Sequence, residues 1–278
     1  MSGATNPKSL AKNMPTPPST VDILRRLLVH SDGRDKTLKI IQYFGKIILW
    51  LQARRAPKSI HGHLLNAITL LIRNKSFSSN VTPRLKAMTS QFSTTRKIIR
   101  LAHFLEPYSE LREYYTGARR ISRSSTSYEK LIHYFGALNA FLGLMNDIFD
   151  DLYCLGKINV LDKSIAKWAE PIAIKLWFFC ICLDIHETLF KIWQMNQKIK
   201  KVNSEELEKY QQRLHWLNIS LTKLFMDFLF CGYDFFDCTF SDGVQALSGF
   251  FAGILTLGKG KPKAHDAFIN NTDYRQSS

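Results

Sequence analysis

Five basic side chains and no carboxylate lie between residues 84 and 105, in the stretch RLKAMTSQFSTTRKIIRLAHFL. The five cations are Arg84, Lys86, Arg96, Lys97 and Arg100. Ammonium and guanidinium groups bind phosphates and carboxylates, so this stretch has the chemistry of an anion-binding surface. A helix of about six turns with one sign of charge is unusual for a soluble protein, and it favours an anionic partner.

Hydrophobic side chains are threaded between these cations at helical spacing. At about 100° per residue, Leu85, Met88, Phe92 and Ile99 share one stripe, and most of the cations lie away from it. The pattern predicts an interfacial amphipathic helix over about 84–105, with the stripe in the acyl boundary and the cations on anionic headgroups. The alternative is an ordinary bundle helix with a basic exposed face. Ile98, Leu101 and Leu105 leave the stripe, which indicates that the carboxyl-terminal part packs on protein.

A second group of chemically active residues is acidic. The motif NDIFDD places Asp147, Asp150 and Asp151 on one helical face. Without a histidine or a fourth ligand, we interpret them as a polar face or as partners of nearby basic residues rather than as a metal site. The chain also lacks G-x-S-x-G, a phosphate-binding glycine loop and H-E-x-x-H. We therefore expect no enzyme activity, no cofactor and no metal.

The composition restricts the class of partner. The chain has 278 residues and a formal net charge of +15, which favours an anionic partner such as nucleic acid or an acidic membrane. No zinc finger, leucine zipper or aromatic RNA-binding strand is present, so nucleic acid is disfavoured. The five cysteines have no zinc-site spacing and are expected to be reduced thiols in a protein that faces the cytosol.

The segments that position the basic and acidic residues are predicted to be helices, because strand-like alternation is absent. Long helices are predicted at about 34–54, 130–158, 165–196 and 212–238, and the fold class is all-α. The expected organisation is a disordered leader (1–19), an amino-terminal helical region (20–115), a basic Ser/Arg-rich linker (116–128), a hydrophobic helical membrane region (129–258) and a basic, polar tail (259–278).

One segment, GVQALSGFFAGILTLG, carries no charge between Asp242 and Lys259. Gly249 and Gly253 form a G-x-x-x-G motif, which lets helix backbones approach closely in lipid. We expect this helix to insert into a membrane, with the basic tail on the cytosolic side. The alternative is a buried glycine-rich helix end in a soluble protein. Two other apolar segments, 177–193 and 223–240, contain acids and are not expected to span a bilayer.

Four segments together resemble the peroxisomal biogenesis factor 11 family. GRDKTLKIIQYFGKI, which begins at Gly33, resembles its amino-terminal signature, and TRKIIRLAHFLEP resembles its second signature. NDIFDDLYCLGKI and ALSGFFAGILTL resemble its central region and its glycine-rich last helix. The chain departs from the pattern at Ala102 and His103, where a glycine and a lysine are common, and it resembles a divergent, fungal-type member. On turn chemistry, we interpret the start of the first signature as a helix-joining turn formed by Gly33, Arg34, Asp35 and Lys36.

The resemblance implies a membrane-associated bundle of long helices that shapes the peroxisomal membrane during proliferation and division. It implies that the amphipathic helix inserts into the cytosolic leaflet, that the chain self-associates or joins paralogues, and that the amino-terminal region faces the cytosol. It also implies hand-over of the elongated membrane to a dynamin-related GTPase and its tail-anchored adaptor. Two alternatives stay open: a metabolite pore in the peroxisomal membrane, and a soluble helical scaffold that binds acidic protein partners.

Overall fold

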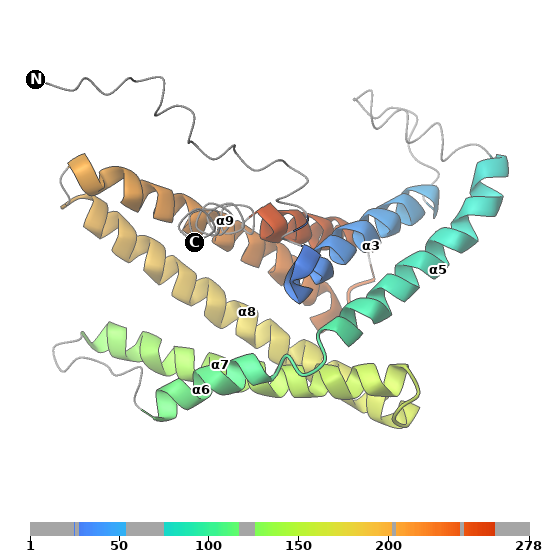
Figure 1. The fold of residues 1–278 in the computed structure, drawn as a ribbon, viewed down its shortest axis with the longest axis horizontal. Helices are drawn as coiled ribbons and strands as arrows, with labels where there is room; N and C mark the ends of the chain where they lie inside the picture. The colour runs from blue at the N-terminus through green and yellow to red at the C-terminus, as the bar shows by residue number, and fades with distance from the viewer. Residues whose placement is uncertain are drawn as a thin grey trace, which may run out of the picture.

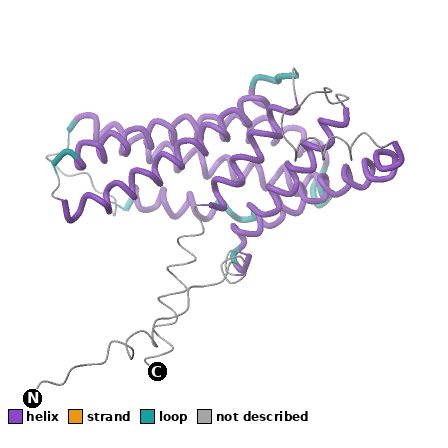
Figure 2. The backbone as a smooth tube through the Cα atoms, turned by 90° about the horizontal axis from the view of Figure 1, so that it is seen from above, coloured by secondary structure: helices purple, strands orange, loops and turns teal. Residues whose placement is uncertain are grey.

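The computed structural model describes residues 25, 28–53, 75–116, 126–201, 204–239 and 242–258. Throughout these ranges the chain forms helices joined by short turns, without strands (Figure 2). The predicted all-α fold class is therefore confirmed. The expected leader (1–19), most of the linker (116–128) and the tail (259–278) lie outside the described residues.

The helices follow one another along the chain in a simple order. They are α3 (Ser31–Ala53), α5 (Lys75–Ile99), α6 (Leu105–Tyr115), α7 (Ser127–Lys157), α8 (Lys163–Ile199) and α9 (Ser204–Phe235), and a last helix covers 242–258. The start of α9 was expected eight residues later, near 212. Residues 204–212 are rich in Glu, Lys and Gln, which are good helix formers, and they extend the helix toward α8.

The helices are arranged as successive hairpins with α5 at the edge (Figure 1). The pairs α7–α8 and α8–α9 pack against each other, α6 lies along α7, and α5 pairs with α3 along its length and touches α7 only near its end. A small core between α8 and α9 contains Phe178, Ile181 and Cys231. The Phe178 ring stacks on Phe235, with centroids 4.2 Å apart.

The start of α7 is fixed by a capping box. The Thr126 hydroxyl accepts a hydrogen bond from the Glu129 backbone N–H, and the Glu129 carboxylate accepts one from the Thr126 N–H. These bonds satisfy two of the amide groups that a helix start leaves free. The capping box therefore sets the boundary between the linker region and the second half of the chain.

The amphipathic helix does not have its predicted bounds. Helix α5 begins at Lys75, continues through Pro83 and ends at Ile99, and the residues up to 104 form turns before α6. The break occurs because Ala102 has a φ of 66°, the left-handed region that ends an α-helix, and its N–H donates to Asp151 Oδ2 at 2.9 Å. Ala102 occupies the position where glycine is common in the resembled family, and glycine adopts this conformation without strain.

Two other expectations change with the structure. The segment from Gly33 to Lys36 belongs to the first turns of α3 rather than to a joint between helices, and Asp35 is buried there. Among the helices in the described part of the chain, none is both long and apolar enough to cross a membrane. The helix 242–258 instead lies with its glycine face close to α3.

Candidate functional site

Helices α3 and α5 run antiparallel and approach closely. A Cβ atom placed on Gly45 would lie 2.7 Å from Thr89 Cγ2 and 3.3 Å from Leu85 Cδ1, so only glycine allows this spacing. At one end of the pair, Thr82 donates a hydrogen bond to the Gln52 side chain at 3.0 Å. The apolar stripe of α5 that the sequence assigned to lipid therefore has a protein partner, since Leu85 packs on α3.

At the other end of the pair, α3, α5 and α7 contribute to a partly buried group of charges. We call it the ionic cluster: Asp35, Arg96, Lys97, Arg100 and Asp150. Arg96 Nε donates to Asp35 Oδ1 at 2.9 Å, Lys97 Nζ bonds Asp150 Oδ1, and Arg100 lies 3.8 Å from Asp35 and 3.6 Å from Asp150. The cations that lack an acid within their own helix thus find carboxylates on two other helices.

The central ion pair of the cluster is buried, and Arg96 has a further, neutral hydrogen-bond partner in Gln42. Asp35 is 1% exposed and Arg96 is 9% exposed, and Arg96 Nη1 also donates to Gln42 Oε1 at 2.9 Å. Asp35 and Gln42 are seven residues apart, so they lie on the same face of α3, two turns from each other. A buried charge of this kind is stable only when its partners are in place.

The charges in the cluster shift one another's pKa values. Burial opposes ionisation of Asp35, but Arg96, Lys36 and Arg100 outweigh it and lower the pKa of Asp35 to about 2. Burial likewise opposes ionisation of Asp150, and its pKa is nevertheless lowered by Lys97 and Arg100. Burial lowers the pKa of Lys97, and Asp150 only partly restores it. Both carboxylates are therefore ionised near neutral pH.

The three acids of NDIFDD all contact the segment at residues 97–103. Asp150 pairs with Lys97, Asp147 Oδ2 lies 2.9 Å from His103 Nδ1, and Asp151 accepts the bond from the Ala102 N–H. The interpretation of Asp147 and Asp150 as partners of nearby basic residues is confirmed. Together they fix the turn that joins α5 to α6.

The structure divides the predicted lipid-contacting residues into three groups. Arg84 and Lys86 are exposed and form no ion pair with a described residue, whereas Arg96, Lys97 and Arg100 belong to the ionic cluster. The apolar members, Leu85, Met88, Phe92 and Ile99, are half-buried. Leu85 and Met88 lie close to Gly45 of α3.

Of the three residues expected to pack on protein, Ile98, Leu101 and Leu105, Leu101 is half-buried and the other two are exposed. Ile98 is 45% exposed and Leu105 is 56% exposed. The sequence assigned the apolar stripe to lipid, but Leu85 and Met88 of the stripe lie close to Gly45 of α3 in the structure. Because α3 packs on this part of the stripe, the opposite face of α5, which carries Ile98, is left outward, whereas Leu105 belongs to α6.

The first signature, at the start of α3, contacts both α5 and α9. From α3, Asp35 and Gln42 bind Arg96 of α5, while Lys39 Nζ donates to Asp227 Oδ1 of α9 at 3.1 Å. Burial lowers the pKa of Lys39 to about 8, although Asp227 opposes this shift. The Tyr43 ring packs edge-on against Phe230 of α9, with centroids 5.3 Å apart.

The glycines of the last helix also lie against α3. A Cβ atom on Gly249 would be 3.0 Å from two carbons of the Tyr43 ring, and one on Gly253 would be 3.0 Å from Ile40 Cγ1. The G-x-x-x-G motif therefore lies at a close helix contact within the chain. The opposite face of this helix stays apolar and exposed, with Phe251 at 49% and Ile254 at 41%.

Sequence reasoning interpreted Asp150 as a partner of basic residues, but it did not pair Asp35, Gln42 or Asp150 with particular cations of the basic helix. The available signal was charge complementarity, because an acid-free segment at 84–105 and an acid-rich one at 147–151 occur in the same chain. Periodicity within each segment cannot show that they meet, since Lys97 and Asp150 are 53 positions apart.

Comparison with known proteins agrees with the resemblance. A family model described as peroxisomal biogenesis factor 11 (PEX11) matches residues 64–259, which is most of the chain and begins after the first signature. No curated protein and no solved structure shows a significant match to the chain. The family acts in peroxisome biogenesis and proliferation and is associated with the peroxisomal membrane. The chain belongs to the peroxisomal biogenesis factor 11 (PEX11) family.

Proposed function

We propose that the chain remodels and elongates the peroxisomal membrane by inserting α5 into the cytosolic leaflet. The observation that carries this proposal is the position of α5, a basic helix at the edge of the molecule whose apolar face is covered mainly by the single helix α3 (Figure 1). Release from α3 uncovers the stripe that an interfacial helix needs, and a wedge at headgroup depth expands one leaflet.

The two ends of α5 are held with different strength. At the carboxyl-terminal end, a buried ion pair joins Arg96 to Asp35 and a partly buried one joins Lys97 to Asp150. The described contacts toward the other end are apolar packing at Gly45 and one hydrogen bond from Thr82. We therefore place the hinge at the ionic cluster: the part up to Phe92 leaves α3, and residues 96–100 stay in place.

The exposed cations define which face of α5 meets the headgroups. Arg84 and Lys86 are free of described ion pairs and lie in the half that we expect to move. Each cation near an acidic membrane contributes about 1 kcal/mol of binding free energy. The ion pairs of Arg96, Lys97 and Arg100 also hold the hinge in place. Replacing any of these three residues therefore affects folding as well as lipid binding.

A second surface supports a location on the membrane. Ile41 and Phe44 of α3 are 40% and 45% exposed, and the Phe44 ring lies 6.1 Å from Phe250 of the last helix. Phe251 and Ile254 of the last helix are exposed as well, and exposed apolar side chains that gather on one surface are typical of an interaction site. We propose that this apolar surface rests against the same leaflet.

The proposal also includes partners, on the basis of the family. These are further copies of the chain, its paralogues, and a dynamin-related GTPase that receives the elongated membrane through its tail-anchored adaptor.

Locking α5 to α3 is expected to abolish membrane remodelling. Thr89→Cys removes the methyl group that lies 2.7 Å from a Gly45 Cβ position, so Gly45→Cys with Thr89→Cys brings two Cβ atoms within reach of a disulfide. The oxidised full-length double variant should fail to tubulate vesicles that contain acidic phospholipid, as seen by electron microscopy, and a reductant should restore tubulation. Thr89→Cys alone is the control, because Gly45→Cys alone would place its Cβ atom 2.7 Å from the Thr89 methyl group. Equal tubulation by the oxidised and reduced double variant would contradict release of α5.

Reversing the exposed cations is expected to weaken vesicle binding without unfolding the protein. Arg84→Glu with Lys86→Glu should lower the affinity for acidic vesicles by about thirtyfold or more, and high salt should reduce the difference. Flotation assays measure the affinity, and thermal unfolding checks the fold. The control is Lys163→Glu with Lys167→Glu, an equal charge change at two exposed positions of α8. If the control loses as much affinity, net charge rather than α5 determines binding.

A further inference from the structure

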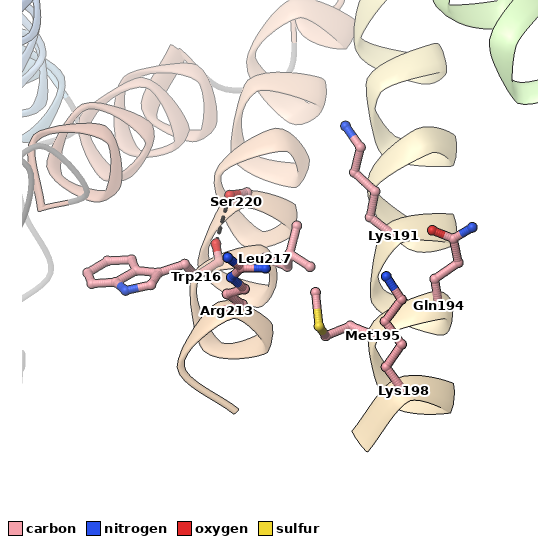
Figure 3. Close-up of a pocket in the computed structure, with 8 residues that line it drawn as sticks. All are labelled: Lys191, Gln194, Met195, Lys198, Arg213, Trp216, Leu217 and Ser220. Carbon is pink, nitrogen blue, oxygen red and sulfur yellow. Dashed lines mark hydrogen bonds between the residues drawn. The ribbon is translucent and has the colours of Figure 1, made fainter. Parts of the chain in front are cut away.

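A groove separates the ends of α8 and α9 where the two helices approach their connecting turn (Figure 3). Its volume is about 390 Å³, within the size range of small-molecule sites. This end of the hairpin lies on the opposite side of the molecule from α5 (Figure 1). The groove is therefore separate from the surface proposed for membrane remodelling.

The charged lining of the groove is entirely basic. Lys191 and Lys198 come from α8, and Arg213 comes from α9. Lys191 is bonded to Glu187 at 2.8 Å, one turn earlier in α8. Lys198 and Arg213 form no ion pair with any described residue. Two uncompensated cations on facing helices attract one anionic group, and a guanidinium binds a phosphate with two parallel hydrogen bonds.

The floor of the groove is apolar. Met195 extends from α8 toward α9, and Leu217 extends from α9 toward α8, so that the two side chains line the space between the helices (Figure 3). A flexible methionine adapts to an irregular apolar ligand. A small soluble anion would leave this floor in water, whereas an amphiphile would cover it and place its charge on the rim.

Tryptophan accompanies the cations at this end of the hairpin. Trp193 is 56% exposed on α8, and Trp216, which lines the groove, carries its indole on the side of α9 away from α8 (Figure 3). Tryptophan together with lysine and arginine is typical of protein surfaces at the level of lipid headgroups. This composition favours a membrane lipid over a soluble anion as the occupant.

We propose that the groove binds one acidic phospholipid. The phosphate lies between Lys198 and Arg213, and the first part of an acyl chain lies against Met195 and Leu217. The site holds an individual lipid by side chains from two helices, unlike the proposed insertion of α5, which contacts the leaflet as a surface. It does not depend on release of α5.

The test is native mass spectrometry of the full-length chain released from an uncharged detergent. Titration with phosphatidylglycerol should give a saturable first adduct at least tenfold tighter than with phosphatidylcholine. Lys198→Gln with Arg213→Gln should weaken the phosphatidylglycerol adduct by about tenfold or more, because each change removes a charge-assisted hydrogen bond. The matched control, Lys200→Gln with Lys209→Gln, removes two exposed charges that do not line the groove and should change the affinity less than twofold.

Three results would overturn the proposal. Equal weakening in the control variant would show general charge attraction rather than a site. Equal affinity for phosphatidylcholine would remove the role of the two cations. Displacement of the lipid by inorganic phosphate at the same concentration would show that a phosphate alone fills the site. Circular dichroism of both variants verifies that the helices remain folded, so that a loss of binding reports on the groove.

Discussion

Asp35→Asn is expected to lower the free energy of unfolding by about 3 to 5 kcal/mol, the usual cost of removing one partner of a buried ion pair. Asparagine keeps the shape of the side chain but not its charge. Arg96, which is 9% exposed, would keep its bond to Gln42 and lose its carboxylate. Arg100 would lose one of its two acidic neighbours. Thermal and urea unfolding followed by circular dichroism measure the change.

Asp32→Asn is the matched control, because Asp32 lies in the first turn of the same helix and is exposed. Its loss should cost less than about 1 kcal/mol, the contribution of an exposed acid at a helix start. Adding Arg96→Gln to Asp35→Asn removes the uncompensated charge and should recover part of the stability, which gives a coupling free energy between the two positions. Equal losses for Asp35→Asn and Asp32→Asn would show that the ionic cluster does not stabilise the fold.

The Asp35–Arg96 ion pair also predicts how the free energy of unfolding depends on pH. The folded pKa of Asp35 is about 2, below the value near 3.9 of an unfolded aspartate, so its contribution is fully present above about pH 4. The contribution, on the order of 2 kcal/mol, is lost as the pH falls from about 4 to about 2. The wild-type protein should therefore lose stability more steeply than Asp35→Asn in this interval. Parallel curves would argue against the lowered pKa.

Gly249→Leu is expected to displace the last helix from α3 and to cost about 1 to 3 kcal/mol, the range for overpacking a close contact. The new side chain would enter space that the Tyr43 ring occupies, since even a Cβ atom lies 3.0 Å from that ring. Tyr43 is 5% exposed and packs edge-on against Phe230 of α9, so it cannot move aside without opening the α3–α9 contact. Adding Gly253→Leu should roughly double the loss.

Gly258→Leu is the control, because no atom lies within 4 Å of a Cβ at that position. It should leave stability within about 0.5 kcal/mol, as expected for a surface change. Hydrogen exchange supplies the second readout: amides of α3 should exchange faster in Gly249→Leu and not in Gly258→Leu. Unchanged exchange in both variants would contradict the contact between the last helix and α3.

The amino-acid sequence by itself determined the helical fold class and most of the helix positions. Periodicity located α3, α7 and α8 to within a few residues, because the spacing of apolar residues reflects the geometry of a single helix. The order of four motifs also indicated the family that the family model matches. The absence of acid in 84–105 favoured an external anion, but Arg96, Lys97 and Arg100 pair with carboxylates of the same chain.

The tertiary structure alone decided what those partners are. Helical spacing shows that Leu85 and Met88 share a face, but not whether the face meets α3 or lipid, because both surfaces are apolar. Likewise, the Arg96 side chain can bind a phosphate or a carboxylate, and only the chain path brings Asp35 to it across 61 positions. Local periodicity fixes which side chains point together, and long-range packing fixes what they touch. The chain therefore pairs the cations at the carboxyl-terminal end of α5 with its own carboxylates, whereas Arg84 and Lys86 stay exposed without a described ion-pair partner.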